Sequence, residues 1–252
     1  MITAYPVVGK RKSYDICESF VRGSGGAIAT AATELRPGAA FFYGVDQSNL
    51  HLWKQVKAER RDYYYCDNSY FDATRQTYFR VTHNRLQHPG VGKSSGIRFN
   101  LLGMPICPWQ SNPEGHVLIC PQSDSFMRDV VGFVGDWCTE TTGALRSLTD
   151  REIRVRSWQR DKGALAATLQ KDLHGASVLM TWSSAAAVTA VLQGISVVTS
   201  ADSAAAPLSS HLFKLDNPKQ STDRSNWAGL LADNQWTVDE IANGTAWRML
   251  ND

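Results

Sequence analysis

Two pairs of serines stand where an apolar run gives way to a stretch of helical character. Ser183 and Ser184 interrupt VLMTWSSAAAVTAVLQG, and Ser123 and Ser125 follow the apolar run HVLIC. A serine in this position caps the free backbone N–H groups at the start of a helix. The same N–H groups, at the positive end of the helix dipole, can bind a phosphate instead. From the residues alone, capping is the simpler interpretation of both pairs.

Three cations, Arg156, Arg160 and Lys162, lie in the segment EIRVRSWQRDKG. Cations grouped in this way can bind a phosphate and stabilise the charge of an anionic leaving group where no metal does. The sequence has no Asp-x-Asp pair and no histidines at metal-ligand spacing, and we therefore expect no metal site. For Arg160 alone, an exposed basic loop is an equally acceptable interpretation.

Asp67, in YYYCDNSYF, ends an aromatic strand and is the first candidate for a general base. Partial burial among Tyr64, Tyr65 and Tyr70 would raise its pKa toward the range that a base requires. The alternative is an ordinary turn, because Asp-Asn-Ser favours turns. Asp46, in YGVDQSN, is a competing candidate that could instead cap the next helix.

His83 ends the predicted strand YFRVTHN and is followed by Asn84 and Arg85. A histidine there could act as a base or polarise an acceptor hydroxyl, and Arg85 could bind a phosphate. A single histidine at a strand end is more often a hydrogen-bonded surface residue, and that alternative stays open.

Aromatic and basic residues alternate closely over residues 53–85, and GKRKS and GVGKSSGIR add two basic loops without P-loop spacing. Nucleic acids are bound by this combination, since aromatic rings stack on bases and cations bind phosphates. The alternative is a set of core aromatic residues with unrelated surface charges. The predicted contacts to DNA are Lys10, Arg11, Lys12, Arg60, Arg61, Arg75, Arg85 and Lys93.

The net charge of +2 is distributed unevenly along the 252 residues. Residues 1–110 contain 14 Lys and Arg against 8 Asp and Glu, whereas residues 111–252 contain 12 against 16. A basic half beside an acidic half is typical of a protein whose basic half faces a polyanion. Solvated charges scattered over the surface are the alternative.

The composition favours a cytoplasmic globular protein. The hydrophobic content of 43% is sufficient for a core, and no apolar run of 18 residues or secretory signal is present. The five cysteines form no Cys-x-x-Cys pair, as expected of reduced thiols. We expect no membrane partner.

The second half alternates apolar runs with amphipathic stretches, which predicts a parallel sheet covered by helices on both faces. We expect strands over 116–121, 151–158, 176–182 and 195–200, with helices over 125–142, 163–175 and 184–194. The first half predicts a smaller, less regular α/β layer. Three prolines in residues 101–116 indicate a linker, which places a domain boundary near residue 112 and gives domains 1–112 and 113–252.

RVRSWQRDKG followed by HGASVLMTWSSAAAVTAVLQGISVVTS resembles the donor-binding domain of GT-B-type glycosyltransferases. The motifs YYYCDNSYF and YFRVTHN and the tail DRSNWAGLLADNQWTVDEIANGTAW are similar to compact, DNA-modifying members of bacterial viruses. The resemblance implies two Rossmann-like domains facing a cleft, with the nucleotide sugar bound by the second, the acceptor by the first, and the tail strapped across both. It also favours phosphate binding over capping at Ser183 and Ser184.

The sequence departs from the GT-B pattern at one point, which leaves the identity of the donor nucleotide open. Many enzymes of this type hold the ribose with a glutamate, and the matching helix SSAAAVTAVLQG contains no acid. A UDP-linked sugar is expected as co-substrate, with no resident cofactor.

The resulting hypothesis is a metal-independent glycosyltransferase of phage type. It would transfer a sugar to the hydroxyl of a flipped 5-hydroxymethylpyrimidine in double-stranded DNA, with Asp67 as the base. Two alternatives stay open. One is transfer to a surface polysaccharide or lipid-linked sugar, which an exposed apolar patch would favour. The other is a non-catalytic protein that binds DNA or nucleotides. The sugar, the anomeric outcome and the oligomeric state are not predicted.

Overall fold

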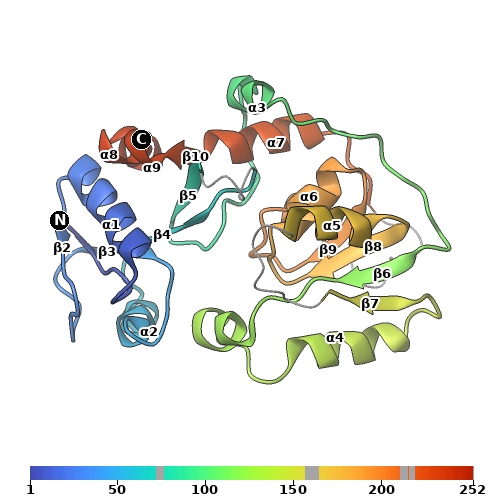
Figure 1. Ribbon diagram of the computed structural model, residues 1–252, viewed down its shortest axis with the longest axis horizontal. Coiled ribbons are helices and arrows are strands. Elements are labelled where there is room, and N and C mark those ends of the chain that lie inside the picture. The colour runs from blue at the N-terminus through green and yellow to red at the C-terminus, as the bar shows by residue number, and fades with distance from the viewer. Residues whose placement is uncertain (72–76, 157–164, 211–214, 216–218, 252) are drawn as a thin grey trace. The chain divides into compact units, whose positions relative to one another are not determined.

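The computed structural model describes residues 1–71, 77–156, 165–210, 215 and 219–251, with only the backbone for 165–168. The chain forms two units, the first made of residues 1–87 and 234–252 and the second of residues 88–233 (Figure 1). The predicted boundary near residue 112 thus falls inside the second unit. Backbone bonds explain the difference, because Cys107 donates to Leu192 and Gln110 to Gly194. A Cβ at Gly194 would overlap the carbonyl oxygen of Pro108, so only glycine permits this close approach.

The first unit contains a mixed sheet with the strand order β10-β5-β4-β3-β1-β2. Strands β1 to β4 run parallel, and β5 and β10 are antiparallel to their neighbours. The strands are β1 (Ile2–Ala4), β2 (Ala27–Ile28), β3 (Ala39–Tyr43), β4 (Tyr63–Asn68), β5 (Tyr78–His83) and β10 (Gln235–Thr237). The helices are α1 (Arg11–Ser24), α2 (Leu50–Glu59), α8 (Val238–Ala242) and α9 (Thr245–Asn251).

Aromatic side chains form the core on both faces of this sheet. On one face Phe20 of α1 stacks on Phe41 at 3.9 Å between ring centres, and Trp236 is fully buried beside them. On the other face Trp53 of α2 contacts Phe42 edge-on at 5.5 Å. Most aromatic residues of 53–85 are thus core residues and cannot stack on bases, which is the alternative interpretation given for this segment. The buried ones include Trp53, Tyr63, Tyr64, Tyr65, Tyr70, Phe71 and Phe79.

The second unit contains a parallel sheet of order β7-β6-β8-β9. Its strands are β6 (His116–Ile119), β7 (Ile153–Val155), β8 (Ala176–Thr181) and β9 (Ser196–Thr199). Its helices are α3 (Ile97–Leu102), η1 (Phe126–Val131), α4 (Trp137–Arg146), α5 (Leu165–Leu173), α6 (Ala186–Leu192), η2 (Ala206–Leu208) and α7 (Arg224–Asp233). The predicted alternation of strands and helices is confirmed.

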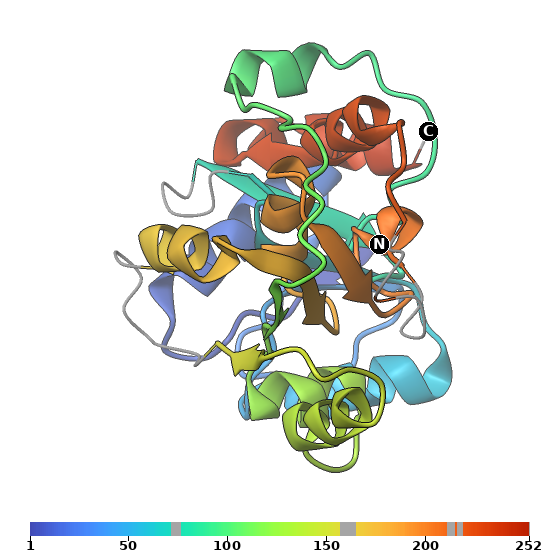
Figure 2. The ribbon, with the colours of Figure 1, turned by 90° about the vertical axis from the view of Figure 1, so that its right-hand side faces the viewer.

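Helices cover both faces of this sheet, with α4 on one side and α5 and α6 on the other (Figure 2). Leu145 of α4 packs on Val117 and Val178, which are both fully buried. Strands buried on both faces need no polar alternation, which explains their near-continuous apolar sequences.

One predicted helix, over residues 125–142, is divided in two. Gly132 ends the π-helical turn η1 with a left-handed φ of 80°, and Asp136 begins α4 by accepting a hydrogen bond from Thr139 N. The predicted helix runs through Gly132 and Gly135, although the left-handed region suits glycine at a helix end. None of the described helices is long and apolar enough to span a bilayer.

Candidate functional site

The carboxyl ends of all four strands of the second sheet lie along one edge. The chain passes from β6 to its neighbour β7 on one side, and then crosses back to β8 on the other side of β6. The direction of winding therefore reverses between β6 and β8. Ligands of open α/β sheets bind at such a point. Ser123 follows β6, and Ser183 and Ser184 follow β8, so the two serine pairs do lie at one edge, as the sequence predicts.

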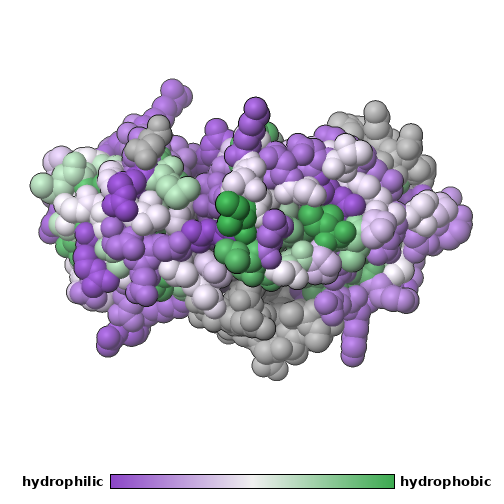
Figure 3. Space-filling model, turned by 90° about the horizontal axis from the view of Figure 1, so that it is seen from above, coloured by the Kyte–Doolittle hydropathy of each residue, from purple (hydrophilic) through white to green (hydrophobic). Residues whose placement is uncertain are grey.

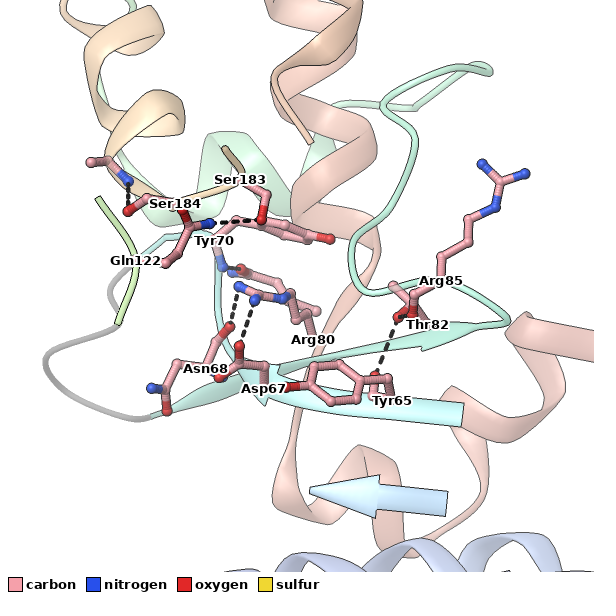
Figure 4. Close-up of polar contacts among 12 residues, drawn as sticks. Tyr65, Asp67, Asn68, Tyr70, Arg80, Thr82, Arg85, Gln122, Ser183 and Ser184 are labelled. Atoms are coloured by element: carbon pink, nitrogen blue, oxygen red, sulfur yellow. Dashed lines mark hydrogen bonds and ion pairs between the residues drawn. The ribbon is translucent and has the colours of Figure 1, made fainter. Parts of the chain in front are cut away.

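Gln122 joins these two strand ends (Figure 4). With its amide oxygen facing the donors, Oε1 accepts hydrogen bonds from Ser183 Oγ at 2.8 Å, Ser183 N at 2.8 Å and Ser184 N at 3.0 Å. These are the N–H groups that the sequence assigned to a phosphate. A phosphate oxygen there would have to replace the glutamine oxygen. Sequence reasoning missed Gln122, since nothing local identifies its partner 61 residues away.

Capping accounts for two of the four serine hydroxyls. Ser184 Oγ accepts from Ala186 N at 3.2 Å, and Ser123 Oγ accepts from Phe126 N at 3.2 Å. Ser125 Oγ lies 3.2 Å from Ser123 Oγ, and Ser183 is 2% exposed. Capping of backbone N–H groups therefore describes Ser123 and Ser184 in this structure.

Arg156 follows β7 at the same edge of the second sheet. Its backbone N donates to Ile119 of β6, and its guanidinium Nε lies 2.8 Å from Asp172 Oδ2 of α5. With 17% of its side chain exposed, Arg156 is positioned by this ion pair. Arg160 and Lys162 lie outside the residues that the structure describes.

In the first sheet the winding reverses between β1 and β3. Lys10 and Asp46, in the loops after these two strands, form an ion pair at 3.0 Å. Asp46 Oδ1 also accepts from Ser48 N at 2.9 Å and Ser48 Oγ at 2.6 Å. Partial burial raises the pKa of Asp46, but the bonds from Ser48 and Lys10 together lower it below its usual value. This makes Asp46 a weaker base.

Asp67 lies near the end of β4, where its Oδ2 is 2.6 Å from Nη2 of Arg80 on β5 (Figure 4). Arg80 Nη1 donates to the Asn68 carbonyl at 2.9 Å, and the guanidinium carbon lies 5.2 Å from the Tyr70 ring centre. Arg80 is 8% exposed and Asp67 36%. The expected burial of Asp67 among tyrosines alone is not observed, because its charged partner is a buried arginine.

Lys12 adds a second cation to this end of β4. Its Nζ lies 3.4 Å from Asn68 Oδ1, and 5.4 Å and 4.9 Å from the ring centres of Tyr43 and Phe79. The first unit therefore presents a mixed charged group of Lys12, Asp67 and Arg80.

His83 lies at the opposite end of the β4/β5 pair. Tyr64 faces His83 in the ladder and Asp67 faces Arg80, a separation of three residues or about 10 Å. The His83 ring stacks on Tyr64 at 4.5 Å, and its Nε2 is 3.6 Å from Asp62. The structure thus does not bring His83 and Asp67 into one catalytic group. His83 is better described as a surface histidine held by its neighbours Tyr64 and Asp62.

The described cations predicted to contact DNA lie on separate parts of the chain. Arg11 pairs with Asp15 on α1 at 2.8 Å, whereas Arg60 and Arg61 precede the amino end of β4. Arg61 donates to the carbonyl oxygens of Arg36 and Gly38, which holds a loop. Arg85 is exposed just after β5, Lys93 belongs to the second unit, and Arg75 lies outside the described residues.

The charge asymmetry also depends on where the chain is divided. Residues 1–87 and 234–252 contain 13 basic and 11 acidic residues, and residues 88–233 contain 13 of each. Both units are therefore nearly neutral, and the charge asymmetry between residues 1–110 and 111–252 is not an asymmetry between the units.

No family model matches the chain, and no curated protein matches it. Among solved structures, the beta Kdo 2,7 transferase of Thermosulfurimonas dismutans KpsC matches with a TM-score of 0.54 and 9% identity, over 98% of this chain and 99% of that one. The beta Kdo 2,4 transferase of the same KpsC matches with a TM-score of 0.47 and 11% identity, over 92% and 89%. The first likeness shows that this α/β fold is similar to a GT-B-type glycosyltransferase structure.

Proposed function

We propose that the protein is a glycosyltransferase that moves a sugar from a nucleotide-sugar donor to a hydroxyl of a saccharide acceptor. The observation that supports this most is the match to a Kdo transferase fold along almost the full length of both chains. A fold alone hosts several functions, so the substrates must be argued from the two sheet edges.

The donor diphosphate is assigned to the carboxyl edge of the second sheet. Its oxygens would take the bonds that Gln122 Oε1 now accepts from Ser183 N and Ser184 N. Arg156 would balance the charge of the leaving diphosphate, with Arg160 and Lys162 as further proposed contacts.

Asp67 is proposed to remove the proton from the acceptor hydroxyl. A carboxylate has about four lone-pair positions, so Asp67 can bind Arg80 and Asn68 N and still accept a proton. Arg80 would fix the orientation of the carboxylate. Asp46 remains the competing base, disfavoured by its lowered pKa.

A saccharide acceptor is preferred over modified DNA. The near-neutral units, the buried aromatic rings and the separated cations remove the charge and stacking arguments for DNA, so that hypothesis depends on the motif resemblance alone. The matched protein is described as a Kdo transferase, which favours an acidic saccharide such as a Kdo-terminated oligosaccharide. A non-catalytic nucleotide-binding protein remains the second candidate, because the helix after β8 lacks the ribose-binding acid.

Mass spectrometry of reaction products tests the proposal. The purified chain is incubated with a panel of activated sugars, including activated Kdo, and with either Kdo-terminated oligosaccharides or hydroxymethylated duplex DNA. We expect a mass gain of one sugar on the oligosaccharide and none with Asp67→Asn. A gain only on the DNA would restore the first hypothesis, and binding of a nucleotide sugar without any product would favour the non-catalytic candidate.

A further inference from the structure

Helix α3 and the loop before it present apolar side chains outward. Leu101 is 82% exposed, Ile97 65% and Val91 62%. Viewed from above, apolar side chains gather over α3 amid a largely hydrophilic surface (Figure 3). Ile97 and Leu101 are one helical turn apart, so they lie on one face.

The segment is held firmly on α7. Phe99, on the inner face of α3, is 6% exposed. Ser94 N donates to Asn226 Oδ1 at 3.0 Å, and Ser94 Oγ donates to Asp233 Oδ2 at 2.6 Å. A Cβ at Gly229 would collide with Ser94, so the loop and α7 are in direct contact. The exposed residues are therefore presented by an ordered element rather than by a frayed end.

The charged residues within the segment have one sign. Lys93 and Arg98 belong to the segment, and the sequence contains no Asp or Glu between Asp72 and Glu114. The nearby carboxylate of Asp233 is hydrogen-bonded to Ser94. Val134, an exposed aliphatic residue (93%) outside this segment, lies two residues from the acidic side chain of Asp136.

We propose that the α3 segment, residues 91–101, docks on the surface of an anionic lipid bilayer. Val91, Ile97 and Leu101 would enter the interfacial region, while Lys93 and Arg98 would face the anionic headgroups. A segment that combines apolar anchors with cations and contains no acidic residue of its own fits a negatively charged lipid surface better than a neutral one. The proposal depends on the patch and holds whether or not the chain transfers a sugar.

Vesicle flotation of the full chain tests this docking. We expect binding to vesicles of phosphatidylcholine with phosphatidylglycerol, weaker binding at high salt, and little binding to phosphatidylcholine alone. The double variant Ile97→Ser/Leu101→Ser should lower the partition coefficient about tenfold or more. Its melting temperature should stay close to that of the native chain, since both side chains are exposed. Leu101→Trp should bind more tightly, because tryptophan favours the interface.

Val134→Ser is the matched control, since it removes an equally exposed aliphatic side chain from the same unit. It should leave vesicle binding unchanged. Equal losses for Val134→Ser and the double variant, or no binding to anionic vesicles, would overturn the proposal. So would a native chain that is dimeric in solution while Ile97→Ser/Leu101→Ser is monomeric, because the face would then join two copies.

Discussion

The carboxyl edges of the two sheets use different chemistry. In the second unit, β6 and β8 end in neutral groups, with a glutamine oxygen that accepts from Ser183 N and Ser184 N. In the first unit, β4 ends in an ion pair between Asp67 and Arg80. Backbone N–H groups suit a ligand that brings its own negative charge, whereas a partly exposed carboxylate suits proton transfer. The difference supports assigning the phosphates to one unit and the base to the other.

The largest expected effect is on catalysis. Asp67→Asn should lower kcat by about 10²–10⁴-fold with a small change in KM, since it removes the proposed general base and keeps the shape of the side chain. Steady-state kinetics on the active acceptor measures this, and thermal unfolding confirms that the variant folds. Asp46→Asn is the matched control, with a loss below about tenfold. The reverse order would place the base at the β1/β3 reversal.

The next effect is on stability, and it compares the ion pairs of the two units. Arg80→Met should cost about 2 kcal/mol in the free energy of unfolding, because the Asn68 carbonyl also loses its donor and the Tyr70 ring loses the guanidinium packed on it. Arg156→Met should cost about 1 kcal/mol, since Asp172 is 38% exposed and remains hydrated. Urea unfolding measures both. Arg80→Lys and the double variant Asp67→Asn/Arg80→Met should each recover part of the stability lost in Arg80→Met. Equal costs for Arg80→Met and Arg156→Met would show that the two ion pairs contribute equally to stability.

Gln122, which joins the ends of β6 and β8, gives a smaller effect. Gln122→Ala should cost about 1 kcal/mol of stability, because Ser183 N and Ser184 N lose the glutamine oxygen, while Ser184 N keeps Thr181 Oγ1 as an acceptor at 3.3 Å. Gln122→Glu should weaken nucleotide-sugar binding about tenfold in calorimetry, since its charge repels a phosphate. Gln55→Ala, which removes an amide bonded to Glu59 on α2, is the control and should change neither quantity. Unchanged donor affinity in Gln122→Glu would argue against a phosphate at Ser183 and Ser184.

The smallest effect concerns Asp46 and pH. Since folding lowers the pKa of Asp46, its contribution to stability is present above the unfolded pKa of about 3.9 and is lost as the pH falls through the folded value. The native chain should exceed Asp46→Asn by less than about 1 kcal/mol near neutral pH, since the carboxylate is 33% exposed. The difference should shrink toward pH ~3 in urea titrations. A constant difference would show that another group causes the loss.

The second sheet could be predicted because its signals are local. Strands β6, β8 and β9 are short, largely apolar runs, and such parallel strands need no register information to be recognised, whereas the edge strand β7 (IRV) is mostly exposed and alternates. Gly175, the last residue of the helix predicted over 163–175, has a left-handed φ of 78° and lies two residues after the end of α5. The serine pairs were located correctly at one edge for the same reason, since all parallel strands end there.

The first unit depends on long-range pairing that no local pattern shows. Arg80 meets Asp67 because β5 returns antiparallel to β4, and the register is fixed by tertiary packing. A lone arginine in the apolar strand YFRVTH was the available signal, since a buried charge requires a partner. Strand β10 has three residues and pairs with β5 from more than 150 residues away. Its pairing with β5 also explains why residues 234–252 belong to the first unit, although the sequence predicts one domain over 113–252.

The position of β10 also sets an order of events during synthesis. Residues 234–251 provide the strand beside β5, the fully buried Trp236 and two helices against α1. Residues 1–87 leave the ribosome first, yet they cannot complete their core until these residues emerge. In the interval β5 is an unpaired sheet edge, which favours aggregation. The second unit, by contrast, can close before the first, so the amino-terminal unit is the last to finish folding.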